Sequence, residues 1–114
     1  MATDVINLAW KQMCKRKFSE AITLLESKAD VYEEDFEFYI MIATAFLYIG
    51  DFGSASTYFQ KARRIKITDT RLLLGQAIIF LRRGDTKRAL QYYLDVKDNE
   101  PSNKIAADAI EFIR

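Results

Sequence analysis

The sequence predicts an all-α protein built from repeated helical hairpins, and three observations support this prediction. Apolar residues recur at helical spacing, as at Ala21, Leu24 and Leu25. Four glycines and one proline in 114 residues are too few for the many turns of a β-sandwich or barrel. The chain also matches itself at an offset of 34 residues, as stacked supersecondary units do. With 50% hydrophobic residues, it has enough apolar side chains for one folded core.

The repeat is clearest between residues 36–69 and 70–103, which are identical at seven of 34 positions. These positions are Ala43/Ala77, Phe46/Phe80, Leu47/Leu81, Gly50/Gly84, Asp51/Asp85, Ala55/Ala89 and Tyr58/Tyr92. Residues 2–35 match the middle copy less well, at Ala9/Ala43, Phe18/Phe52, Ala21/Ala55, Thr23/Thr57 and Asp35/Asp69. We therefore expect three copies, of which the first is the most diverged.

Each copy predicts two antiparallel helices joined by a tight turn. In the middle copy the first helix covers about 35–49, and Gly50 then supplies a residue that adopts positive φ past the helix end. Asp51 follows as the expected N-cap of the second helix, and Gly84 with Asp85 repeats the pattern. Arg16 occupies the equivalent glycine position of the first copy, so we expect the first turn to be either slightly strained, at a cost of about 1 kcal/mol, or different in shape.

The residues after Pro101 predict a seventh helix over 102–114. Ser102 is the expected N-cap, and one side of the helix carries Ile105, Ala109, Ile110 and Ile113. Because the open end of a stack of repeats leaves apolar surface in water, we expect this helix to cover the third copy.

These features resemble the tetratricopeptide repeat (TPR) family, whose 34-residue helix-turn-helix units carry small residues at helix contacts, aromatic residues beside them and a final proline. The match is best in 70–103, at Ala77, Phe80, Gly84, Ala89, Tyr93 and Pro101. The resemblance implies a right-handed superhelix in one TPR-like domain, 1–114. Its repeats would span 2–35, 36–69 and 70–103, and a capping helix would span 102–114.

In this family the first helix of each repeat lines a concave surface that receives peptides or partner helices. The residues at those positions are mainly apolar: Ile6, Trp10, Met13, Ile40, Thr44, Leu47, Tyr48, Leu74, Ile78 and Leu81. Such a patch is larger than most monomers expose, which favours a partner there. Arg71 and Arg82 would orient the partner by pairing with its acidic groups. Coverage by the last helix or by a second copy of the chain is the alternative.

The clamp that some family members use for acidic chaperone tails is not expected here. It requires Lys and Asn at set positions of successive first helices, where this sequence has Ile6, Trp10, Met41, Arg71 and Gly75. Only Arg71 fits that requirement. The apolar lining is more similar to the grooves of repeat chaperones that hold secretion-system subunits.

Composition argues against catalysis and against several classes of ligand. The absence of histidine excludes His-based triads and imidazole general bases, and Cys14 alone forms no internal disulfide or thiolate cluster. Glu33 and Glu37 are spaced like paired carboxylates, but the start of a helix explains them. We expect Cys14 to be a small packing residue. The net charge of +1 gives no reason to expect nucleic acid. The longest apolar stretch, residues 40–49, is about half as long as a membrane span, so insertion into a membrane is not expected.

The sequence thus predicts a non-catalytic protein-interaction module without metal or cofactor. The alternatives are a homo-oligomeric assembly scaffold that uses the same face and a regulatory domain of a longer enzyme. A cytoplasmic location is expected, because one cysteine suits a reducing compartment and residues 1–7 lack the pattern of a secretory signal.

Overall fold

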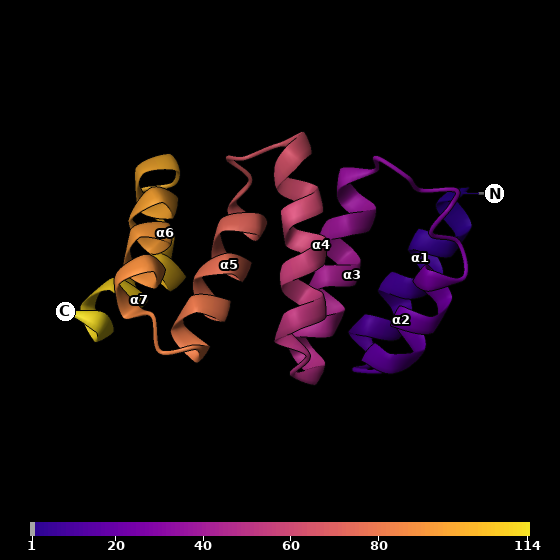
Figure 1. Ribbon diagram of the computed structural model, residues 1–114, viewed down its shortest axis with the longest axis horizontal. Helices are drawn as coiled ribbons and strands as arrows, with labels where there is room; N and C mark the ends of the chain where they lie inside the picture. Colours follow the sequence, from indigo (N-terminus) through magenta and orange to yellow (C-terminus); the bar gives the residue numbers. More distant parts are fainter. Residues whose placement is uncertain (1) are drawn as a thin grey trace. The chain divides into compact units, whose positions relative to one another are not determined.

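The computed structural model describes residues 2–114, with side chains from Val5 onward, and these residues are all-α. Seven helices are described (Figure 1): α1 Ala2–Cys14, α2 Phe18–Glu26, α3 Phe36–Ile49, α4 Phe52–Ile65, α5 Thr70–Arg82, α6 Thr86–Asn99 and α7 Lys104–Ile113. They fall into two compact units, of which one ends at Ile65 and the other spans Lys66–Arg114.

The amino-terminal unit contains two helical hairpins. In the first, α1 packs on α2, and in the second, α3 packs on α4; α3 also contacts α1 and α2. Ala9, Ala21, Ala43 and Ala55 are fully buried. Because an alanine adds so little bulk, the backbones of the paired helices approach closely there, and the large Phe59 side chain is buried as well.

The carboxyl-terminal unit contains one hairpin, α5 with α6, and the single helix α7. Helix α7 packs on α6, as expected for a helix that caps the third repeat. The buried core draws on all three helices and comprises Leu73, Ala77, Ala89, Tyr93, Val96, Ala106 and Ile110.

The turns within the hairpins confirm the conformations expected from the sequence. Gly50 and Gly84 have φ of 85° and 82° at the ends of α3 and α5. The Asp51 carboxylate then accepts a hydrogen bond from the Ser54 N–H at 3.1 Å, and the Asp85 carboxylate accepts one from the Arg88 N–H at 3.1 Å. Each aspartate satisfies an N–H group that the first turn of a helix leaves without an intrahelical partner.

The turn between α1 and α2 adopts the same backbone conformation without glycine. Arg16 has φ of 62°, which is the strained one of the two alternatives expected for this turn. The following helix α2 has nine residues, whereas α4 and α6 have 14 each. The first hairpin is therefore the one that departs most from the repeat.

The predicted N-cap of the last helix is wrong by one residue. Helix α7 begins at Lys104, and its N-cap is Asn103 rather than Ser102. The Asn103 side-chain oxygen accepts a hydrogen bond from the Ala106 N–H at 2.9 Å. Asparagine and serine are about equally good caps, so the sequence alone does not decide between adjacent candidates.

Glycine substitutions test the turn geometry. A Cβ at Gly50 would meet no atom within 4 Å, so Gly50→Ala should destabilise the protein by about 1 kcal/mol through backbone conformation alone. Gly53 lies within α4, and a Cβ there would have only an ordinary contact, at 3.8 Å from Asp51 Oδ1. Gly53→Ala should instead stabilise by about 0.5 kcal/mol. Urea denaturation measures both changes, and equal effects would contradict the assigned turn.

Candidate peptide-binding surface

In the amino-terminal unit, the predicted contact residues form one stripe on α1 and one on α3. Residues three and four apart share a helix face, and α1 packs against α3. Trp10 on α1 is 57% exposed and Tyr48 on α3 is 62% exposed, while Ile6 and Leu47 are half-buried. The Thr44 hydroxyl donates a hydrogen bond to the Ile40 carbonyl at 2.7 Å. Because its polar group is satisfied within the helix, Thr44 adds to the apolar character of this stripe.

Phe18 supports this surface, although the sequence did not single it out as a site residue. Its ring stacks on the ring of Tyr48, with centroids 4.7 Å apart and planes 7° apart. The contact already holds the exposed Tyr48 ring in place, so little further side-chain entropy is lost when a ligand binds to it. The signal was present in the repeat, because Phe18 matches Phe52. Nothing in the sequence, however, linked Phe18 to Tyr48.

Two predicted contact residues are buried instead. Met13 is 9% exposed and Ile40 is 4% exposed. Helix α3 packs against three helices of its own unit, and these contacts bury part of the apolar surface that was expected to face a partner. Met13 and Ile40 therefore contribute to packing and offer little surface to a partner.

In the carboxyl-terminal unit, the predicted contact residues lie on α5. Leu74, Ile78 and Leu81 are half-buried, and Leu74 and Leu81 also pack against the core of this unit. Arg82 is exposed in the last turn of the helix, where its charge complements the helix dipole. This face is thus a partly buried apolar stripe with a cation at one end.

Arg71 is held by its own chain rather than standing ready for a partner. Its guanidinium donates two hydrogen bonds to the Asp69 carboxylate, from Nε at 3.1 Å and from Nη2 at 3.0 Å. The same carboxylate accepts a hydrogen bond from the Arg71 backbone N–H at 2.9 Å and caps α5. A partner's acidic group would have to compete with this bidentate pair.

Cys14 is exposed, so the prediction that it is a packing residue is wrong. Among the described residues, no group of three or more histidine, cysteine or acidic side chains is arranged to hold a metal ion. None of the helices described is both long enough and apolar enough to cross a membrane.

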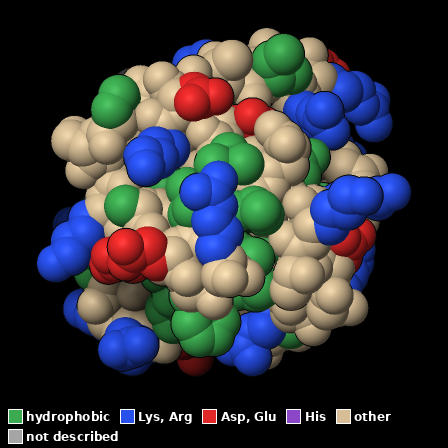
Figure 2. Space-filling view, turned by 90° about the vertical axis from the view of Figure 1, so that its left-hand side faces the viewer, with side chains coloured by type: hydrophobic (Ala, Val, Ile, Leu, Met, Phe, Trp, Pro, Cys, Tyr) green, Lys and Arg blue, Asp and Glu red, His purple; other side chains and the backbone are tan. Residues whose placement is uncertain are grey.

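Apolar side chains are also exposed away from the stripes on α1, α3 and α5. On α7, Ile105 is 62% exposed and Phe112 is 82% exposed. Figure 2 shows the carboxyl-terminal side of the molecule, where hydrophobic side chains gather near the middle of the face, among basic and acidic ones. Phe112 thus provides an exposed aromatic residue outside the candidate surface.

The comparison with solved structures agrees with the repeat pattern, whereas two sequence comparisons find no match. No family model matches the sequence, and no curated protein matches it. Solved structures do match. The first TPR domain of Spaghetti (RPAP3), bound to the HSP90 peptide SRMEEVD, aligns with a TM-score of 0.90 at 19% identity, over 98% of this chain and 89% of that chain.

Two further structures give similar values. The Yersinia enterocolitica type III secretion chaperone SycD, in complex with a peptide of the translocator YopD, has a TM-score of 0.86 at 16% identity, over 98% of this chain and 91% of that chain. The Arabidopsis OM64 TPR domain has a TM-score of 0.87 at 20% identity, over 93% and 88%. The chain therefore has a TPR-like fold of helix-turn-helix repeats, which confirms the resemblance seen in the sequence.

The pair of Asp69 and Arg71 makes stability depend on pH. Burial acts to raise the pKa of Asp69, but the hydrogen bonds and charge of Arg71, together with backbone N–H groups, outweigh it and lower the pKa below its ordinary 3.8. Because the pKa of Asp69 is lower in the folded state than in the unfolded state, its charged form stabilises the protein at pH values above the unfolded-state pKa. This contribution is lost as the pH falls through the folded-state pKa.

We expect wild type to exceed Asp69→Asn in stability by about 0.5 kcal/mol near neutral pH, a small value because Arg71 is half exposed. Asparagine keeps a capping oxygen but removes the charge. The difference should shrink as pH falls below about 4. Urea denaturation of both proteins across this range measures it, and a difference that is constant or grows toward low pH would contradict the assignment.

Proposed function

We propose that the chain is a non-catalytic protein-interaction module that binds a peptide or a partner helix on the apolar face of α1 and α3 in the amino-terminal unit, and that the apolar stripe of α5 is a contact surface of the carboxyl-terminal unit. The observation that carries this proposal is the exposure of Trp10 and Tyr48, two large aromatic side chains, on first helices of the repeats. Aromatic residues dominate binding energy at protein interfaces, and Tyr48 is already fixed by its stack on Phe18.

The similar structures support the general class of function. The RPAP3 domain is bound to a peptide of HSP90, and SycD is bound to a peptide of YopD. Both proteins share the fold with this chain at low sequence identity, so the ligand must be argued from the residues of this chain.

Those residues favour an apolar ligand over an acidic tail. The clamp positions carry Ile6, Trp10, Met41 and Gly75, and Arg71 is already paired with Asp69. Burial of apolar surface, at about 25 cal/mol per Å², would therefore be the main source of affinity. We propose that Arg82 contacts an acidic group of the ligand and so fixes its orientation. The nearest analogy is a chaperone that holds an apolar segment of its client.

Selection of peptides from a displayed library tests this proposal. We expect the selected peptides to be rich in apolar residues, and Trp10→Glu to weaken their binding by about tenfold or more, since an unpaired charge would face an apolar ligand. Phe112→Glu is the matched control, because it makes the same kind of change at an exposed aromatic residue of α7. Equal losses in the two variants, or selection of acidic tails, would contradict the proposal.

Self-association through the same face is the competing interpretation, and light scattering separates the two. If the face receives another protein, the purified chain should keep the mass of a monomer over a wide range of concentration. If it joins two copies, the mass should rise with concentration for wild type and for Phe112→Glu but not for Trp10→Glu. Trp10→Glu and Phe112→Glu should each change the free energy of unfolding by no more than about 0.5 kcal/mol, because both side chains are exposed.

A further inference from the structure

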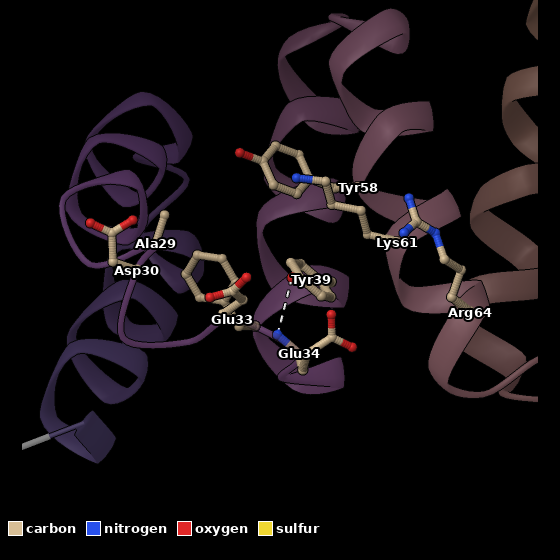
Figure 3. Close-up of a pocket in the computed structure, with 9 residues that line it drawn as sticks. Ala29, Asp30, Glu33, Glu34, Tyr39, Tyr58, Lys61 and Arg64 are labelled. Atoms are coloured by element: carbon tan, nitrogen blue, oxygen red, sulfur yellow. Dashed lines mark hydrogen bonds between the residues drawn. The ribbon is translucent and has the colours of Figure 1, made fainter.

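The amino-terminal unit contains a cavity of about 370 Å³, and its lining residues are separate from the predicted contact residues on α1 and α3 (Figure 3). Its walls come from the segment between α2 and α3, the start of α3 and the second half of α4. The lining residues are Ala29, Asp30, Glu33, Glu34, Phe38, Tyr39, Tyr58, Lys61 and Arg64. The volume lies within the range of pockets that hold small ligands, about 300–1,000 Å³.

The aromatic residues of the cavity are held by contacts with one another and with the segment before α3. The Tyr39 side chain is buried, and its hydroxyl accepts a hydrogen bond from the Glu34 backbone N–H at 3.1 Å. This bond, drawn as a dashed line in Figure 3, ties the segment before α3 to the helix. The Tyr39 ring meets the edge of the Phe38 ring, with centroids 5.8 Å apart, and lies 6.3 Å from the Tyr58 ring. The rings therefore form a preorganised surface.

Glu34 is held in place at a cost. Its φ of 64° lies in the left-handed region, which a residue with a side chain adopts only when its surroundings enforce it. The hydrogen bond to Tyr39 is one such constraint. As a result, the segment that carries the acidic residues has a fixed course along the cavity.

The charged residues of the cavity are sorted by sign. Asp30, Glu33 and Glu34 come from the segment before α3, and Lys61 and Arg64 come from α4 (Figure 3). Among the described residues, no ion pair joins the acidic group to the basic one. The unit thus presents opposite charges that do not neutralise each other directly.

The Lys61 ammonium lies against aromatic rings of the cavity. Its Nζ lies 5.2 Å from the centre of the Tyr58 ring and 5.9 Å from that of Tyr39, so the ammonium is held on the aromatic rings. Burial and the nearby charge of Glu26 raise the pKa of Tyr58 above its ordinary value of 10.0, so the phenol beside this cation is neutral at neutral pH. The ammonium still has N–H groups to donate to an incoming anion.

We propose that this cavity is a second binding site of the protein, for a peptide segment in which a basic side chain stands next to an acidic one. The basic group would contact Asp30 and Glu33, and the acidic group would contact Lys61 and Arg64. A ligand with charge of one sign would be repelled by one of the two groups, so the arrangement selects a pair of opposite charges. This site extends the proposed function, since none of its residues belongs to the apolar faces.

Three capped peptides of equal length test the proposal: Gly-Lys-Glu-Gly, Gly-Lys-Lys-Gly and Gly-Glu-Glu-Gly. Each is titrated into the full chain labelled with nitrogen-15, and amide shifts are followed. We expect the mixed peptide to shift amides of residues 29–34 and 58–64 saturably, and to bind about tenfold more tightly than either other peptide.

Adjacent arginines provide a matched pair of variants. Arg64 lines the cavity and Arg63 does not. Arg64→Gln should weaken the mixed peptide severalfold, whereas Arg63→Gln should not change its affinity. Lys61→Glu should shift the preference to the peptide with two lysines. Thermal unfolding followed by circular dichroism checks that each variant is folded. Trp10→Glu should leave this binding intact, so that failure of the apolar face and failure of this site are distinguishable.

The proposal is overturned by any of three results. The first is the absence of saturable shifts in residues 29–34 and 58–64. The second is equal affinity for all three peptides or tighter binding of a peptide of one sign, which would make the cavity a nonspecific or single-ion site. The third is an equal loss of affinity in Arg63→Gln and Arg64→Gln.

Discussion

The close approach of paired helices at buried alanines is the constraint on which the rest of the structure depends. Ala43 and Ala55 in one hairpin, and Ala77 and Ala89 in another, are fully buried at equivalent positions 34 residues apart. Larger side chains there would force the helices apart, because the interface between paired helices is closely packed. Positive φ at Gly50 and Gly84 reverses the chain in register with these contacts. Small residues and turns together define the hairpin that is repeated.

The surfaces follow from this arrangement. Once each hairpin is closed through its alanines, the first helices still carry apolar residues on other faces, of which some are buried and some remain exposed. Burial of Ile40 and exposure of Tyr48 on the same helix show that the division is made by neighbouring helices rather than by the sequence of α3 alone. The charged cavity also depends on helix packing, since the segment between α2 and α3 places acidic residues near α4.

Local features were predictable from the sequence and distant pairings were not. The 34-residue repeat predicted the helices, the glycine turns and the caps at Asp51 and Asp85, because each depends on residues close together in the chain. The stack of Phe18 on Tyr48 joins residues 30 positions apart, and Asp30 and Arg64 line one cavity from separate segments. Both arrangements depend on how the helices pack, which the repeat pattern does not specify. The burial of Met13 depends likewise on helix packing.

The central claim is that the exposed aromatic residues of the first helices receive an apolar segment of another protein. Intermolecular nuclear Overhauser effects between a selected peptide and this chain test it most directly. We expect contacts from apolar side chains of the peptide to the rings of Trp10 and Tyr48. Contacts confined to α6 and α7, or a bound peptide that leaves both rings free, would contradict the account.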